Sequence, residues 1–102
     1  MVNKARSVKY RSADYLKTKE DIVEYLNAAI EDGNERVLLM ALRNVVDALG
    51  GMTRLAKETG LKRESLYRTL SEKGNPRLSS LVAMLDYMDL ELAVRPRNSS
   101  TR

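Results

Sequence analysis

Apolar positions between residues 18 and 89 recur three and four residues apart, which is the spacing of one face of an α-helix. The pattern predicts a first helix that begins after Thr18, an N-cap residue with Asp21 three positions later, and that ends at Gly33. The residues expected on its buried face are Ile22, Leu26, Ala29 and Ile30. Three carboxylates in its first turns, on Glu20, Asp21 and Glu24, would stabilise this helix by interacting with the positive end of its dipole.

A second helix is expected from Asn34, which can cap it, to the break at Gly50 and Gly51. Its apolar stripe is Leu38, Ala41, Leu42, Val45 and Leu49. Three shorter helices follow, over residues 52–59, 63–71 and 78–89. The last of them is expected to bury Leu81, Val82, Leu85 and Met88.

Residues 91–94 alternate between polar and apolar side chains, as in a β-strand. A lone four-residue strand is not stable, so it would need a partner strand from the N-terminal arm or from a second copy of the chain. The expected fold is therefore all-α, with five helices and an additional short C-terminal strand. The expected organisation is a flexible basic arm at 1–13, the folded domain at 14–95 and a disordered tail at 96–102.

The composition narrows the class of protein. The chain has 102 residues, enough for one modest domain, and it contains neither Cys nor His. Disulfides, thiolate metal sites and the commonest general base are thereby excluded, and an enzyme is the weakest reading. We expect no cofactor, no metal and no small-molecule substrate. No apolar run is long enough to span a bilayer, and no signal peptide is evident, so a cytoplasmic protein is expected.

The net charge of +4 hides a block pattern. Residues 1–19 carry six basic and one acidic side chain, and residues 20–49 carry seven acidic and two basic. Residues 50–77 carry seven basic and three acidic side chains, and the remaining residues are balanced. Adjacent blocks of opposite sign can serve two partners of opposite charge, although a merely solubilising surface is the alternative.

Residues 52–71 have the pattern of a helix-turn-helix. Ala56 is small where two helices must approach closely, and Gly60 stands where the turn needs a left-handed backbone. The apolar positions that would face the core are Leu55, Leu61, Leu66 and Leu70. In such a motif the second helix enters the DNA major groove, although an ordinary helical hairpin is the alternative.

The long polar residues of the second helix are the candidates for reading bases. Arg63 and Arg68 can each donate two hydrogen bonds to guanine, worth about 1–3 kcal/mol of discrimination. Glu64 can accept from cytosine or hold a neighbouring Arg, and Tyr67 can contact a thymine methyl group or a phosphate. The alternatives are weak surface ion pairs for the charged residues and rim packing for Tyr67.

Residues flanking this helix are candidates for phosphate contacts, which supply affinity without sequence information. They are Thr53, Arg54, Lys62, Lys73, Asn75 and Arg77. Thr53 has the alternative role of capping the helix over residues 52–59.

The run from Gly60 to Ser71, followed by Gly-Asn-Pro-Arg-Leu at 74–78, resembles the antidote proteins of addiction modules. These form a HigA-like branch of the Cro/repressor helix-turn-helix superfamily. Tyr15-Leu16, Glu20-Asp21-Ile22 and residues 25–29 are also similar to that family's opening helix, so the resemblance covers about residues 14–95. Lys62 departs from the family pattern, which often has a capping Ser or Thr there, a loss of about 1 kcal/mol.

The resemblance implies an antitoxin that neutralises a RelE- or HigB-like ribonuclease toxin and represses its own operon as a dimer on a palindromic operator. By position, the family's base-reading residues fall on Arg63, Glu64, Tyr67 and Arg68. A ribonuclease is expected to be basic, so the acidic helix with Glu20, Asp21 and Glu24 is the candidate toxin-binding surface. For the dimer we expect the helix over 78–89 together with Leu92 and Val94.

Two rival readings remain open from the sequence. One is a stand-alone prophage-type regulator, which binds DNA without a toxin partner. The other is a helical protein-interaction module that binds no nucleic acid and whose binding is insensitive to salt.

Overall fold

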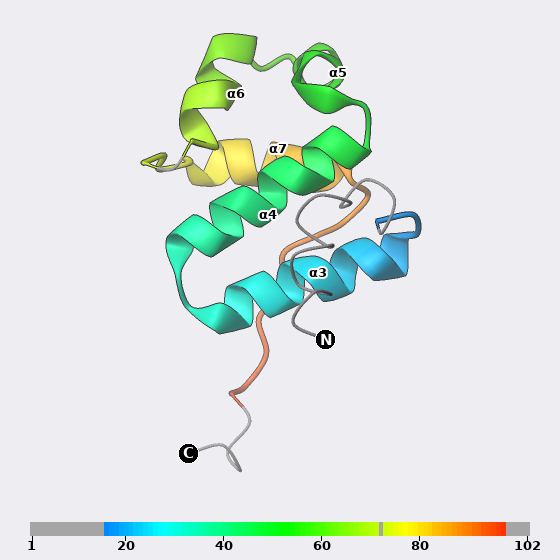
Figure 1. The fold of residues 1–102 in the computed structure, drawn as a ribbon, viewed down its shortest axis with the longest axis vertical. Helices are drawn as coiled ribbons and strands as arrows, with labels where there is room; N and C mark the ends of the chain where they lie inside the picture. Colours follow the sequence, from blue (N-terminus) through cyan, green and yellow to red (C-terminus); the bar gives the residue numbers. More distant parts are fainter. Residues whose placement is uncertain (1–15, 72, 98–102) are drawn as a thin grey trace, which may run out of the picture.

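A computed structural model describes residues 16–71 and 73–97 of the chain. Within them lie the helices α3 (Lys19–Asp32), α4 (Glu35–Ala48), α5 (Gly51–Thr59), α6 (Arg63–Thr69) and α7 (Leu78–Tyr87), labelled as in Figure 1. The described part is all-helical, as expected. The predicted arm at 1–13 and most of the predicted tail lie outside the described residues.

The predicted start of α3, the N-cap of α4 and the end of α5 at Gly60 are confirmed. Thr18 caps α3 by accepting a hydrogen bond from the backbone N–H of Asp21, and the Asp21 carboxylate completes a capping box. Asn34 caps α4 in the same way through Arg36 N–H, at 2.8 Å. Gly60 ends α5 with a φ of 78°, the left-handed conformation that glycine adopts at little cost.

The core is largely aliphatic and is formed by side chains from all five of these helices. α3 packs on α4, and α5 packs on α4, α6 and α7, so that α4 and α7 lie between α3 at one end and α5 and α6 at the other (Figure 1). The side chains that are most completely buried are Leu42, Val45, Val46, Leu55, Leu66 and Met84. Two hydrogen bonds connect α4 to its neighbours: the Asn44 amide of α4 donates to the Tyr25 hydroxyl of α3, and the Tyr87 hydroxyl of α7 donates to the carbonyl of Leu49, the C-cap of α4.

Several predicted core positions are wrong. Ile30 is 55% exposed and Val82 is 40% exposed, because each lies at the edge of its helix's buried face. Three further predicted core residues, Leu38, Leu49 and Leu81, are only partly buried. The structure also shortens two helices, since α6 ends at Thr69 and α7 at Tyr87.

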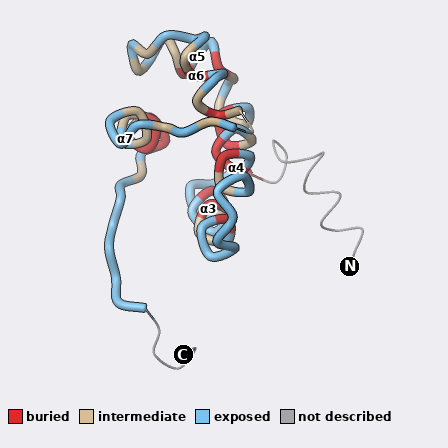
Figure 2. The backbone as a smooth tube through the Cα atoms, turned by 90° about the vertical axis from the view of Figure 1, so that its left-hand side faces the viewer, coloured by how far each residue is buried: buried red, intermediate tan, exposed pale blue. Residues whose placement is uncertain are grey.

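The predicted strand at 91–94 is wrong for the described chain. Residues 90–97, hereafter the C-terminal segment, carry no regular secondary structure. No backbone hydrogen bond among the described residues involves positions 91–97, so the segment lacks the partner strand that its alternation requires. It descends from α7 beside the α3–α4 layer and is exposed from Glu91 onward (Figure 2).

Candidate nucleic-acid interface

The helices α5 and α6 meet at a corner built from local hydrogen bonds. The Thr59 hydroxyl donates to the carbonyl of Leu55 at 2.7 Å and accepts from the backbone N–H of Leu61 at 3.2 Å. Gly60 lies between them, and its left-handed φ turns the chain toward α6. Sequence reasoning missed Thr59, although a Thr directly before the turn glycine is a residue type that bonds nearby backbone groups.

The inner side of this corner is apolar, as the pattern predicts. Leu55, Leu66 and Leu70 are buried, and Leu61 and Ala56 are partly buried. Burial of these side chains fixes α6 against α5, so the orientation of α6 depends on tertiary packing. The packing leaves the opposite side of α6 free to face a ligand.

The four candidate base-reading residues lie on the part of α6 that packing leaves uncovered. Arg63, Glu64, Tyr67 and Arg68 are all exposed. Glu64 and Arg68 project away from the core, whereas Arg63 and Tyr67 lie at the edge of the buried face, three residues before Leu66 and Leu70 respectively. Their role in reading bases stays a prediction.

Tyr67 lies between two guanidinium groups. The guanidinium carbons of Arg43 on α4 and Arg63 on α6 each lie 5.5 Å from the centroid of the Tyr67 ring. This distance is within the range of a cation–π interaction. Tyr67 is 39% exposed and contacts both cations. Packing at the edge of the helix, which was the alternative role of Tyr67, therefore accounts for part of its contacts.

Arg43 is a residue that sequence reasoning did not single out. It comes from α4, outside the helix-turn-helix, and it extends the positive surface of α6 onto a neighbouring helix. The sequence held one signal for Arg43: Arg36 and Arg43 are the two basic residues among the seven acidic residues of positions 20–49. The contact itself is non-local and depends on how α4 and α6 cross.

The candidate phosphate-binding residues flank α6 on both sides and are exposed. Thr53 and Arg54 lie on α5, Lys62 is the N-cap of α6, and Lys73, Asn75 and Arg77 lie between α6 and the start of α7. The capping alternative for Thr53 is wrong, because α5 begins at Gly51 with Gly50 as its N-cap. Thr53 is instead the third residue of that helix.

The first turn of α6 carries no side-chain cap. Lys62 stands at the N-cap position and makes no capping hydrogen bond, which agrees with its departure from the family pattern. Its ammonium group adds positive charge next to Arg63. The sequence here places charge where a Ser or Thr would add about 1 kcal/mol of helix stability.

At the opposite end of the molecule, α3 carries five carboxylates and one lysine (Figure 1). Asp21 accepts hydrogen bonds from the backbone N–H groups of Thr18 and Lys17, at 3.1 and 3.2 Å, which lower the pKa of its carboxyl group. Lys19 pairs with Asp89 after α7, a contact that raises the pKa of Lys19 and lowers that of Asp89. Of the three candidate toxin-binding residues, Asp21 thus has a local capping role, and Glu20 and Glu24 are exposed.

The described residues show neither a metal-binding cluster nor a membrane-spanning helix. Across residues 16–71 and 73–97 no group of three or more acidic side chains is arranged to hold a metal ion. In that same part of the chain, no helix has the length and apolar character needed to cross a membrane.

Comparison with known proteins gives two matches. Residues 6–96 match the family described as "Probable addiction module antidote protein". An uncharacterized protein of Haemophilus influenzae is 31% identical over 83 residues, which cover 81% of this chain and 84% of that protein. No solved structure matches the chain.

Proposed function

This chain belongs to the family of probable addiction module antidote proteins, and from that premise we propose that it is an autorepressing antitoxin of a type II toxin–antitoxin module. The antidote role and a cognate toxin as partner follow from the family. Such a role is regulatory rather than enzymatic. The proposal adds that the protein binds the operator of its own operon through α6.

The observation that supports DNA binding is the exposed face of α6. It presents two arginines beside a tyrosine, on a helix held by a glycine corner against α5. Arg63 and Arg68 are proposed to read guanines, with Glu64 and Tyr67 between them. A helix of seven residues reaches only a few base pairs, so sequence specificity requires more than one copy on the operator.

The flanking side chains are proposed to fix this helix on the duplex. Six exposed residues on both sides of α6 have side chains that can contact phosphate oxygens. They are Thr53, Arg54, Lys62, Lys73, Asn75 and Arg77. Arg43 joins them as a seventh contributor from α4, through its contact with Tyr67.

The toxin partner is proposed to be a RelE- or HigB-like ribonuclease, which would be basic because it binds RNA. The acidic α3 is the surface of opposite sign, with Glu20 and Glu24 as its free carboxylates and Asp21 as its cap.

A homodimer is proposed through the exposed apolar side chains of α7 and the C-terminal segment. Leu78 and Val82 on α7 are exposed, and Val94 is fully exposed, with Leu92 two residues before it. Two copies would bring two α6 helices to one palindromic operator. The Val94→Asp substitution should release monomers, which light scattering detects, and an intact dimer would contradict this placement.

A gel-shift titration of the operon's own promoter tests the proposed function. We expect specific binding that weakens steeply with salt, with a log–log slope of about −4 if the four cationic flanking side chains, on Arg54, Lys62, Lys73 and Arg77, each displace a counterion. Adding the protein encoded by the adjacent reading frame should change the mobility of the complex. No promoter binding would contradict autorepression, and salt-insensitive binding would favour a protein-interaction module. Promoter binding without any interaction with the neighbouring protein would favour a stand-alone regulator.

A further inference from the structure

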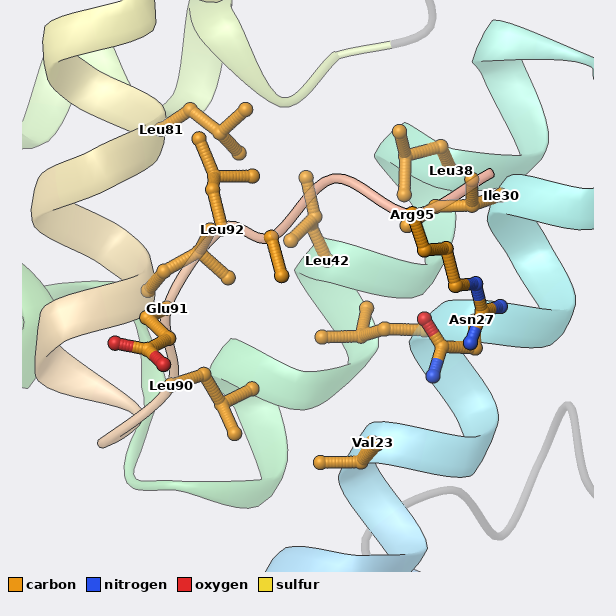
Figure 3. A pocket seen from close by; sticks show the side chains of 13 residues that line it. Val23, Asn27, Ile30, Leu38, Leu42, Leu81, Leu90, Glu91, Leu92 and Arg95 are labelled. Carbon is orange, nitrogen blue, oxygen red and sulfur yellow. The ribbon is translucent and has the colours of Figure 1, made fainter. Parts of the chain in front are cut away.

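An open groove lies between α3, α4, α7 and the C-terminal segment (Figure 3). Its volume is about 350 Å³. Its walls are largely aliphatic, with Val23 and Ile30 from α3, Leu42 from α4, Leu81 from α7 and Leu92 from the C-terminal segment. None of its lining residues belongs to α5 or α6.

The apolar walls of the groove are partly uncovered. Ile30 and Leu92 each expose more than half of their surface, and Val23 is also exposed. Contiguous exposed apolar side chains around a groove are typical of a protein-binding surface. Burying them against a partner would be favourable in proportion to the apolar area removed from water.

Within the part of the chain that the structure describes, the backbone of the C-terminal segment beyond Leu90 makes no hydrogen bond and lies beside this groove. The last backbone hydrogen bond that ties the segment to α7 runs from Leu90 N–H to the carbonyl of Leu85 at 2.8 Å. Beyond it, the described segment is held by Leu92 against the groove and by an exposed ion pair between Arg95 and Glu31, at 3.7 Å. Unpaired N–H and C=O groups beside an apolar groove suit the addition of a partner's strand.

One border of the groove is acidic. Glu20, Glu24 and Glu31 lie on the same face of α3 as Asn27, which lines the groove, because they are seven, three and four residues from it. Glu91 lines the groove from the other side. A partner that enters here therefore meets several carboxylates and one lining cation, Arg95, which is paired with Glu31.

We propose that this groove is the docking site for a basic segment of the cognate toxin, which adds along the C-terminal segment, inserts apolar side chains between Ile30 and Leu92, and pairs its cations with Glu20 and Glu24. The proposal rests on the proposed antitoxin function and adds the place and the chemistry of the contact. It assigns Leu92 to the groove and leaves the dimer contact to Leu78, Val82 and Val94.

The position of the groove determines whether the toxin and the operator DNA can bind at the same time. The groove borders α3, at the end of the molecule opposite to α5 and α6 (Figure 1). A toxin seated there leaves Arg63, Tyr67 and Arg68 uncovered. Toxin and operator should therefore bind the same antitoxin molecule together.

The test compares two matched lysine substitutions in the full-length chain. Ile30→Lys places a cation in the groove, and Met40→Lys is the control, because Met40 is as exposed but lies on the part of α4 away from the groove. The probe is the purified protein from the adjacent reading frame, measured by isothermal titration calorimetry. We expect Ile30→Lys to weaken binding at least about 30-fold and Met40→Lys to change it less than about 2-fold.

A second variant tests the carboxylates beside the groove. The double substitution Glu20→Lys and Glu24→Lys should weaken toxin binding about 10-fold at low salt and make binding less salt-dependent, because it removes the attraction between unlike charges. Asp21 is left intact, so the cap of α3 persists. Circular dichroism melts of each variant check that the fold is retained.

The outcomes separate the groove from the proposed function. If the wild type binds the toxin and the groove variants bind equally well, the groove assignment is overturned and the antitoxin role stands. If the wild type does not bind the neighbouring protein, the proposed function fails and the groove assignment fails with it. If Ile30→Lys turns a dimer into a monomer by light scattering, the groove holds a second copy and the proposal is overturned. Release of operator DNA by the toxin, in place of a slower-migrating ternary complex, would overturn simultaneous binding.

Discussion

The two ends of the molecule are stabilised in different ways. At the acidic end, α3 has 14 residues, a capping box at its start and a left-handed glycine at its end. At the basic end, α6 has seven residues and no side-chain cap, and it depends on the burial of Leu66 and Leu70. Local hydrogen bonds thus define α3, whereas tertiary packing defines α6. The N-cap position of α6 holds Lys62, a charge suited to a ligand rather than to helix stability.

The largest expected effect follows from a close backbone approach after α6. A Cβ added at Gly74 would lie 1.8 Å from the carbonyl oxygen of Thr69, at the end of α6, so the backbone would have to move. We expect Gly74→Ala to cost about 2–4 kcal/mol and to lower the melting temperature by roughly 8 °C or more.

Gly60→Ala is the matched control for that substitution. A Cβ at Gly60 meets nothing within 4 Å, so only the left-handed φ opposes it, at about 1–2 kcal/mol. Thermal melts followed by circular dichroism compare the two variants. Equal losses would show that packing around the end of α6 is not tighter than at the corner with α5.

A smaller effect is expected at the cap of α3. Thr18→Ala should lower the free energy of unfolding by about 1 kcal/mol, because it removes the hydroxyl that accepts from Asp21 N–H. Urea denaturation at pH 7 measures this loss. An unchanged midpoint would mean that the capping box does not stabilise the acidic end.

The same cap predicts a dependence on pH. Because the pKa of Asp21 is lowered in the folded chain, its contribution is complete above the unfolded value of about pH 4 and is lost as the pH falls through the folded pKa. Asp21→Asn should therefore lose less stability than the wild type between pH 7 and pH 3. Asp47→Asn on α4 is the control, since only the backbone of Asp47, and not its side chain, takes part in a helix cap. Equal acid sensitivity in all three proteins would contradict the assignment.

The smallest expected effect tests whether Arg43 of α4 belongs to the basic surface that binds the operator. Arg43→Ala should weaken operator binding about 2–5-fold, the scale of one exposed cation–π contact. The same substitution in a Tyr67→Ala background should have no further effect if Arg43 acts through the tyrosine. Equal losses in both backgrounds, measured by fluorescence anisotropy, would show that Arg43 acts independently of Tyr67.

The sequence predicted the features of the fold that arise locally. The N-caps Thr18 and Asn34 and the turn at Gly60 depend on neighbouring residues, and all three are confirmed. Ile30 and the strand at 91–94 were predicted wrongly, because burial and strand pairing depend on what lies opposite in space. The contact between Arg43 and Tyr67 was missed for the same reason. The exposed face of α6 was predictable because it follows from the helical spacing of its own apolar residues.

The most direct test of the account is operator binding by the double variant Arg63→Ala and Arg68→Ala. Both side chains are exposed, so the variant should fold, which its circular dichroism spectrum and melt can verify. At about 1–3 kcal/mol for each arginine, specific affinity should fall by roughly 30-fold or more, toward that for unrelated DNA. Undiminished recognition of the operator by this folded variant would contradict the claim that α6 reads DNA.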